Sequence, residues 1–139
     1  MSVRVLIVDD HAAMRRSLTQ VLGSESGVHV VGEAPDGTAA IQLAAALRPD
    51  IVVMDVMMPS MDGIDATRRI VQDHPETIVI GLSVHDSRTY AVKMLRAGAR
   101  AYVLKDGGVE ELVLAMRVAR TGHTYLSPGI EGLDRFGAS

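Results

Sequence analysis

The sequence contains no cysteine and no tryptophan, and it has a single phenylalanine among 139 residues. The absence of cysteine excludes disulfide bonds and thiol chemistry, and it favours a cytoplasmic location. The shortage of aromatic side chains excludes a platform on which nucleic-acid bases could stack. The formal net charge of −3 also argues against nucleic-acid binding by this chain, because such binding needs a basic face.

Long hydrophobic runs are missing as well. No apolar run approaches the length of a membrane span, and residues 1–4 lead into a strand-like segment without the regions of a signal peptide. We therefore expect no membrane partner. Apolar residues make up 47% of the chain, and its length suits one domain with a substantial core.

The most informative stretch is residues 51–59, where four apolar residues run without a break up to Asp55. A short continuous apolar run is typical of a strand that is buried on both faces of a parallel sheet. Asp55 then falls at the carboxyl end of the strand, where ligands bind in open α/β sheets. Taken alone, Asp55 could equally begin a turn, because Pro59 and the pair Asp62–Gly63 follow it.

Strand-like and helix-like segments alternate five times along the chain. The expected strands are residues 3–8, 28–31, 51–55, 77–83 and 101–104, and the expected helices are residues 12–22, the segment between the turns at 36–38 and 48–50, and residues 64–73, 87–97 and 109–121. This alternation favours an α/β fold with a parallel sheet, helices on both faces and right-handed crossovers. The first helix places Met14, Leu18, Val21 and Leu22 at helical spacing. Residues 123–139 lack a strong period, with one helical turn expected near 131–136.

Reactive side chains stand at the carboxyl ends of four of the expected strands. They are Asp9, Asp10, Asp55, Ser83 and Lys105. Because a parallel sheet places these ends along one edge, we expect the five side chains to converge. Each aspartate alone is equally well explained as a turn or cap residue. Lys105 alone is better explained as a solvated lysine, and Ser83 alone as a turn residue. Independent turn residues, however, would not be expected to form this set.

The set suggests phosphate chemistry assisted by a metal ion. Three neighbouring carboxylates repel one another, and a divalent cation relieves that repulsion. Mg²⁺ prefers such hard oxygen ligands together with phosphate oxygens. Lys105 and the Ser83 hydroxyl are suited to binding further phosphate oxygens. Asp55 is then the candidate nucleophile, because carboxylates can form acyl phosphates.

With these motifs in place, the chain resembles the receiver domain of two-component response regulators, of the NarL/FixJ subgroup. The matching motifs are VLIVDDH at 5–11, VMDVMMP at 53–59, MDG at 61–63, LS at 82–83, AGA at 97–99 and YVLK at 102–105, within a resemblance over about residues 3–122. The resemblance implies a flavodoxin-like (CheY-like), doubly wound, five-stranded parallel sheet of order 2-1-3-4-5 with five helices. Residues 1–122 would form the receiver domain, and residues 123–139 a tail or the start of a linker to a helix-turn-helix DNA-binding domain.

The resemblance also implies roles for single residues. Asp55 would accept a phosphoryl group from a sensor histidine kinase. Mg²⁺ would be held by Asp9, Asp10, Asp55 and the backbone carbonyl of Met57. His11 is not expected to bind the metal, because Mg²⁺ disfavours imidazole ligands.

Further residues would bind phosphate, switch the surface or tune the reaction. Ser83 and Lys105 would bind the phosphoryl oxygens, and Met57 and His85 would tune how fast the phosphoryl group is lost. Tyr102 would swing inward when Ser83 moves toward the phosphate, unless it is only a half-buried strand tyrosine. The surface that changes would comprise the fourth helix, the fifth strand and the last helix.

The expected function is therefore a phosphorylation-dependent switch of a phosphorelay, acting on transcription through a DNA-binding domain outside this chain. It would not be an enzyme beyond its own phosphorylation and dephosphorylation, and dimerisation on phosphorylation stays open. Two alternatives remain: a phosphohydrolase of the haloacid dehalogenase type and a pseudo-receiver that binds partners without phosphorylation. In the haloacid dehalogenase type, the nucleophile follows the first strand and the acidic pair comes last, whereas here the pair comes first. One departure from many receivers is Asp106, which replaces a proline after Lys105, so we assume no cis bond there.

Overall fold

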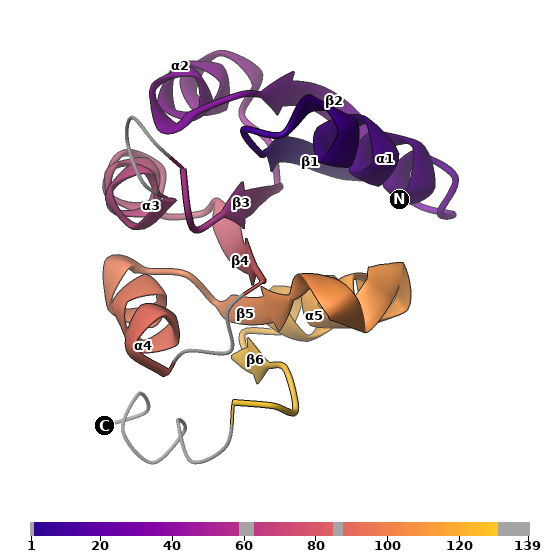
Figure 1. Cartoon of the computed structure of the whole chain (residues 1–139). Coiled ribbons are helices and arrows are strands. Elements are labelled where there is room, and N and C mark those ends of the chain that lie inside the picture. The colour runs from indigo at the N-terminus through magenta and orange to yellow at the C-terminus, as the bar shows by residue number, and fades with distance from the viewer. Residues whose placement is uncertain (1, 59–62, 85–87, 131–139) are drawn as a thin grey trace.

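The computed structural model describes residues 2–58, 63–84 and 88–130, which form one sheet flanked by helices (Figure 1). The strands are β1 (Val3–Val8), β2 (Val28–Ala34), β3 (Ile51–Asp55), β4 (Ile78–Ser83), β5 (Ala101–Leu104) and β6 (Tyr125–Leu126). The helices are α1 (Ala12–Gly23), α2 (Gly37–Leu47), α3 (Gly63–Asp73), α4 (Arg88–Ala97) and α5 (Gly108–Arg120), with a short 3₁₀ helix η1 (Lys105–Gly107) before α5.

The sheet is parallel throughout and has the order β2-β1-β3-β4-β5-β6. This confirms the doubly wound α/β fold and the expected order of the first five strands. A sixth strand, β6, was not expected from the sequence. It consists of only two residues, which is too short for an alternating or continuous apolar pattern to appear.

Helices cover both faces of the sheet, with α1 and α5 on one face and α2, α3 and α4 on the other (Figure 1). Alternate residues of each strand enter the two cores. In β3, for example, Val52 and Met54 belong to the core beneath α2–α4, and Ile51 and Val53 belong to the core beneath α1 and α5. Burial on both faces is the reason that the central strands are apolar at every position.

The segment after α5 is attached to the sheet by a small hydrogen-bond network. The Tyr125 hydroxyl and the Ser127 hydroxyl each donate to the Glu111 carboxylate, over 2.8 and 2.9 Å. The backbone N–H of Leu104 donates to Ser127 Oγ over 2.9 Å, at the end of β5. The first part of the expected tail therefore packs on the sheet, and the helical turn expected near 131–136 lies outside the described residues.

Helix α1 buries less of its apolar side than its sequence predicts. Leu22 is fully buried, but Met14 and Val21 are 37% and 39% exposed. These exposed side chains line a groove of about 280 Å³ between α1 and α5, which Lys105 borders at the carboxyl edge of the sheet. None of the helices in the described ranges is long and apolar enough to cross a bilayer.

Candidate functional site

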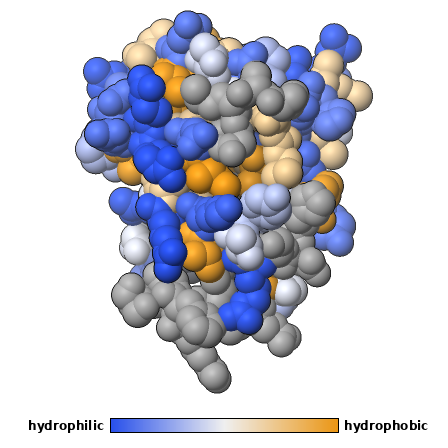
Figure 2. All heavy atoms as spheres, turned by 60° about the vertical axis from the view of Figure 1, so that its left-hand side comes forward, coloured by the Kyte–Doolittle hydropathy of each residue, from blue (hydrophilic) through white to orange (hydrophobic). Residues whose placement is uncertain are grey.

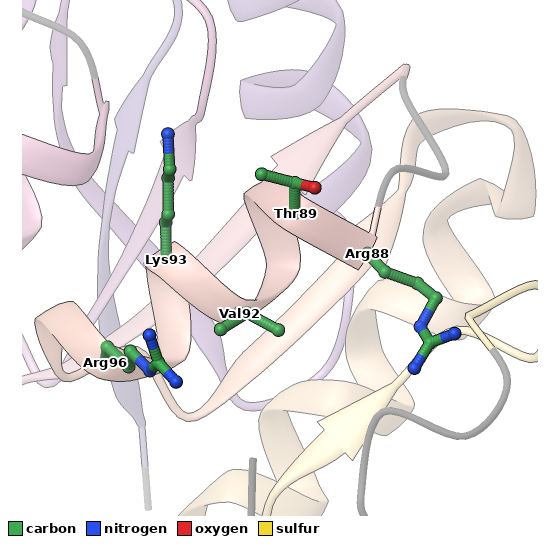
Figure 3. Close-up of a pocket in the computed structure, with 5 residues that line it drawn as sticks. All are labelled: Arg88, Thr89, Val92, Lys93 and Arg96. Atoms are coloured by element: carbon green, nitrogen blue, oxygen red, sulfur yellow. The ribbon is translucent and has the colours of Figure 1, made fainter. Parts of the chain in front are cut away.

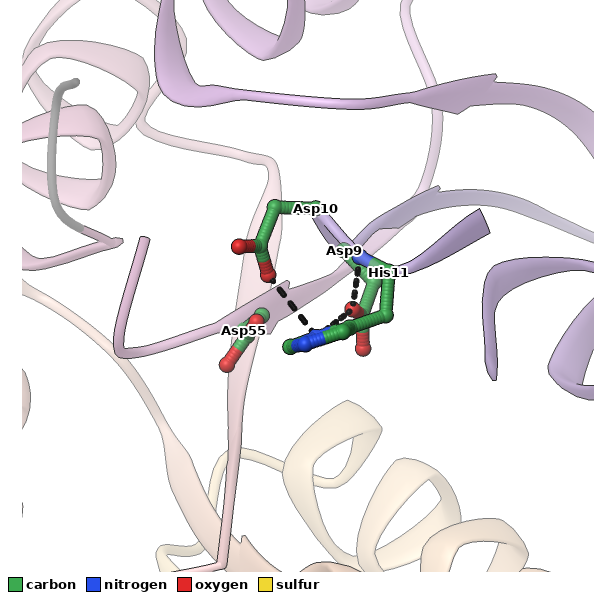
Figure 4. Close-up of side chains that lie close together, drawn as sticks. All are labelled: Asp9, Asp10, His11 and Asp55. Carbon is green, nitrogen blue, oxygen red and sulfur yellow. Dashed lines mark hydrogen bonds and ion pairs between the residues drawn. The ribbon is translucent and has the colours of Figure 1, made fainter. Parts of the chain in front are cut away.

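Three carboxylates meet at the carboxyl edge of the sheet. Asp9 and Asp10 follow β1, and Asp55 is the last residue of β3, the neighbouring strand. One ligand atom from each of these carboxylates and from the His11 ring lies within 4.8 Å of the other three (Figure 4). Asp9 is fully buried and Asp55 is 4% exposed, so the cluster lies largely inside the protein.

Lys105 completes the cluster from the end of β5. Its ammonium lies 3.1 Å from Asp9 Oδ2 and 3.7 Å from Asp55 Oδ1, and its side chain is only 11% exposed. The cation partly offsets the repulsion between the two buried carboxylates. Charges in such a setting interact more strongly than charges in water.

The backbone around Asp55 holds its carboxylate in place. The N–H of Met57 donates to Asp55 Oδ1 over 3.3 Å. Helix α3 begins directly against this strand end, where Gly63 donates its N–H to the Val56 carbonyl over 3.0 Å. A side chain at Gly63 would clash with the Asp55 carbonyl oxygen, so only glycine lets α3 start so close to the site.

The pKa of Asp55 is raised from 3.8 to about 6, mainly because burial disfavours the charged form. Lys105 opposes this shift, whereas the negative charge of Asp9 and a hydrogen bond with the Asp10 carboxyl add to it; the hydrogen bond from Met57 lowers the pKa slightly. The charged form of Asp55 is therefore disfavoured at this position, and a bound cation would favour it.

Asp10 provides direct evidence that the site suits a cation. Its Oδ1 atom is buried and accepts no hydrogen bond, and His11 Nδ1, 3.2 Å away, forms an ion pair with it only when the imidazole is protonated. A buried carboxylate oxygen without a partner is costly. Three carboxylates, one of them with such an oxygen, form a donor set that fits Mg²⁺. The His11 side chain is 76% exposed and offers nitrogen, which this ion disfavours.

The structure places the other expected site residues as follows. Ser83 is fully buried at the end of β4, one position beyond Leu82, the register partner of Asp55. Tyr102 is also fully buried, in the core that contains α4, and is thus not the half-exposed tyrosine of the alternative interpretation. Met57 is 42% exposed, and His85 lies outside the described residues.

A second concave surface lies apart from the carboxylates, along the outer side of α4. It has a volume of about 540 Å³ and is lined by Arg88, Thr89, Val92, Lys93 and Arg96, whose side chains Figure 3 shows. Figure 2 shows hydrophilic side chains across much of the face to which α4 contributes. None of the lining residues belongs to the acidic cluster, so this surface is separate from the Asp55 site.

One contact in the site was not expected from the sequence. Arg15, in the first turns of α1, donates from Nη1 to the backbone carbonyl of Asp9 over 2.6 Å. The spacing contains a signal for it, because helical side chains point back toward the N-terminus. A long side chain four residues after His11 can therefore reach the acidic turn.

Comparison with known proteins agrees with this geometry. The family model of the response regulator receiver domain matches residues 5–117. The response regulator GacA of Pseudomonas viridiflava is 39% identical over 128 residues, which are 92% of this chain and 60% of the relative. The transcriptional regulatory protein LiaR of Bacillus subtilis is 37% identical over 132 residues, which are 94% of this chain and 62% of the relative.

Among solved structures, the chain is similar to a two-component response regulator of the LuxR family from Aurantimonas sp. SI85-9A1. The TM-score is 0.89 at 35% identity, and the match covers 94% of this chain and 93% of that one. The chain spans about 60% of the length of the curated relatives that it matches. The comparison therefore bears on the domain described above and not on the remainder of those proteins.

Proposed function

The chain belongs to the response regulator receiver domain family, and we propose that it acts as a phosphorylation switch with Asp55 as the acceptor. The observation that carries this proposal is the buried Asp55 carboxylate, with the Lys105 ammonium 3.7 Å from it. In the reaction, a carboxylate oxygen of Asp55 attacks the phosphorus of the donor. The bond from phosphorus to the donor's leaving group breaks, and an acyl phosphate forms.

Mg²⁺ would be held by Asp9, Asp10, Asp55 and the backbone carbonyl of Met57. When bound, the ion supplies positive charge that offsets the charge on the phosphoryl oxygens. Lys105 would release its contacts with the carboxylates in favour of one of these oxygens. The Ser83 hydroxyl, at the adjacent strand end, would donate a hydrogen bond to another.

The donor would be a sensor histidine kinase, and the output would be transcription. The support for this output is that relatives such as LiaR of Bacillus subtilis are named transcriptional regulatory proteins. DNA binding would come from a region of the full-length protein outside this chain, and the setting would be the cytoplasm. Dimerisation on phosphorylation would be compatible with this role. Catalysis would be limited to phosphorylation and dephosphorylation of the protein itself.

The two alternatives have less support. The relatives reported above are regulators, which offers no support for a phosphohydrolase. A pseudo-receiver would not need the acceptor, the acidic pair and the lysine to be kept together. Here Lys105 contacts both Asp9 and Asp55, so the complete arrangement favours an active receiver.

Incubation of the purified chain with acetyl phosphate tests the proposed function. With Mg²⁺ present, we expect intact-mass spectrometry to show the gain of one phosphoryl group. We expect no gain when a chelator removes the ion, because the carboxylates would then repel the incoming phosphate. Gain of the same mass in chelator would contradict the role of the metal, and steady release of phosphate from unrelated phosphate esters would favour the phosphohydrolase.

The surface formed by α4, β5 and α5 would carry the signal outward. Tyr102 is buried against the core beneath α4, and Ser83 and Leu104 are register partners on β4 and β5. We expect phosphorylation to change backbone amide hydrogen exchange in α4 and β5 by severalfold and to leave α2, which packs on β1 and β2 at the opposite edge of the sheet, unchanged. Equal changes in α2 and α4 would contradict a localised switch surface.

A further inference from the structure

We propose that Arg15 is a positioning residue for the Mg²⁺ site and that it fixes the peptide between Asp9 and Asp10 from an anchor on Glu33. This inference rests on the proposed function, because it concerns the metal on which phosphorylation would depend. It assigns a role to an arginine side chain that lies outside the acidic cluster. Arg15 lies in α1, and Glu33 lies in β2.

The contacts of Arg15 form a bridge between two elements. Its Nη1 donates to the Asp9 carbonyl over 2.6 Å, and its Nε donates to Glu33 Oε1 over 3.2 Å. The Arg15 side chain is 17% exposed and that of Glu33 is 33% exposed, so the bridge is partly shielded from water. The planar guanidinium can make both contacts at once, whereas a lysine ammonium has no such fork.

The bridge completes the restraint of Asp9. The N–H of Asp9 donates to the Ala34 carbonyl over 3.1 Å, and its side chain accepts from the His11 N–H over 2.8 Å and from Lys105 over 3.1 Å. The Asp9 carbonyl has Arg15 as its donor. Every polar group of Asp9 is thus held, and the carbonyl is held by a side chain from another element.

The restraint passes from Asp9 to Asp10 through the peptide plane. The Asp9 carbonyl and the Asp10 N–H belong to one planar unit, so fixing the carbonyl also fixes the direction in which Asp10 leaves the turn. Asp10 is less restrained than Asp9, because its Oδ1 atom accepts no hydrogen bond and lies 3.2 Å from the ring of His11, whose side chain is 76% exposed. We therefore expect Arg15 to determine where the Asp10 carboxylate points when the metal arrives.

A simple charge effect of Arg15 would have the opposite sign. The positive charge of Arg15 repels Mg²⁺, so loss of that charge alone would make metal binding tighter. Loss of positioning would make metal binding weaker, as is usual when a residue that orients metal ligands is removed. The direction of the change in Mg²⁺ affinity therefore separates the two roles.

The test is isothermal titration calorimetry with Mg²⁺ alone, on wild type and four variants. We expect Arg15→Gln to weaken Mg²⁺ binding by about tenfold or more, within the range found for residues behind metal ligands. Arg15→Lys keeps the charge but should also weaken binding, and Glu33→Gln should weaken it less. Arg16→Gln is the matched control, because Arg16 is the exposed neighbour on the same helix, and it should bind Mg²⁺ like wild type.

Phosphorylation measured against Mg²⁺ concentration provides the second readout. A positioning role raises the Mg²⁺ concentration needed for the half-maximal rate and leaves the maximal rate close to wild type, whereas damage to the fold lowers the maximal rate itself. Unchanged or tighter Mg²⁺ binding by Arg15→Gln, or wild-type binding by Arg15→Lys, would overturn the proposal. If Arg15→Gln does not fold, unchanged affinity in Glu33→Gln overturns it instead. Failure of the proposed function would appear in wild type itself, as absence of Mg²⁺ binding or of phosphorylation.

Discussion

Replacement of Lys105 by methionine is expected to destabilise the metal-free protein by about 3 kcal/mol, because it leaves buried carboxylates without their cation. The Lys105 ammonium lies 3.1 Å from Asp9 Oδ2 and 3.7 Å from Asp55 Oδ1. Asp9 is fully buried and cannot recover the lost interaction from water. Methionine keeps most of the apolar stem, so the lost charge dominates the change.

The same substitution should make stability strongly dependent on Mg²⁺. The ion can replace the missing charge among the carboxylates, so added Mg²⁺ should raise the free energy of unfolding more in Lys105→Met than in wild type. Phosphorylation at saturating Mg²⁺ should be slower by about a hundredfold, because a charge that stabilises the phosphoryl oxygens is gone. Urea unfolding with and without Mg²⁺, together with phosphorylation rates, checks both effects.

Lys93→Met is the matched control, since Lys93 is the other lysine of the sequence and is exposed on α4. It should unfold and accept phosphate like wild type. If Lys105→Met unfolds at the same urea concentration as this control in the absence of metal, the described ion pairs contribute nothing to stability. A wild-type phosphorylation rate in Lys105→Met would remove the lysine from the reaction.

Asp55→Asn is expected to be more stable than wild type at neutral pH when no metal is present. The pKa of Asp55 is about 6 in the folded protein, against 3.8 for the unperturbed group. The folded state therefore binds the proton more tightly than the unfolded chain, and the wild type loses stability as the pH rises from about 4 through 6. This difference in pKa corresponds to about 3 kcal/mol of unfolding free energy, which the wild type loses well above pH 6. The variant would not lose it, because asparagine does not ionise.

Denaturant unfolding at a series of pH values measures this difference. Wild type and Asp55→Asn should differ least near or below about pH 3, where Asp55 is largely protonated in both the folded and the unfolded state, and most above about pH 7. Mg²⁺ should narrow the gap at neutral pH, because it stabilises the wild-type carboxylate. A variant that is less stable than wild type at pH 7 would show that Lys105 more than compensates for the burial of Asp55.

Much of this architecture could be predicted from the sequence because buried parallel strands leave a clear pattern. The run of apolar residues before Asp55 is buried at every position, and the order of the first five strands is as expected. The convergence of Asp9, Asp55 and Lys105 followed from the geometry of a parallel sheet, whose strands end along one edge. These features can be predicted because the apolar pattern and the alternation of strands and helices are visible in the sequence.

The remaining features depend on contacts between distant residues. β6 pairs with β5 through backbone hydrogen bonds, and Tyr125 and Ser127 also donate to Glu111 of α5; no local pattern indicates these contacts. The exposure of Met14 and Val21 likewise depends on how closely α1 approaches α5, which helical spacing cannot show.

The central claim is that Asp55 is the phosphoryl acceptor, and one comparison of intact masses tests it most directly. Wild type, Asp55→Asn and Asp73→Asn are incubated side by side with acetyl phosphate and Mg²⁺, where Asp73 is an exposed aspartate at the end of α3. We expect wild type and Asp73→Asn to gain one phosphoryl group and Asp55→Asn to gain none. A phosphoryl group gained equally by Asp55→Asn would place the acceptor elsewhere and contradict the account.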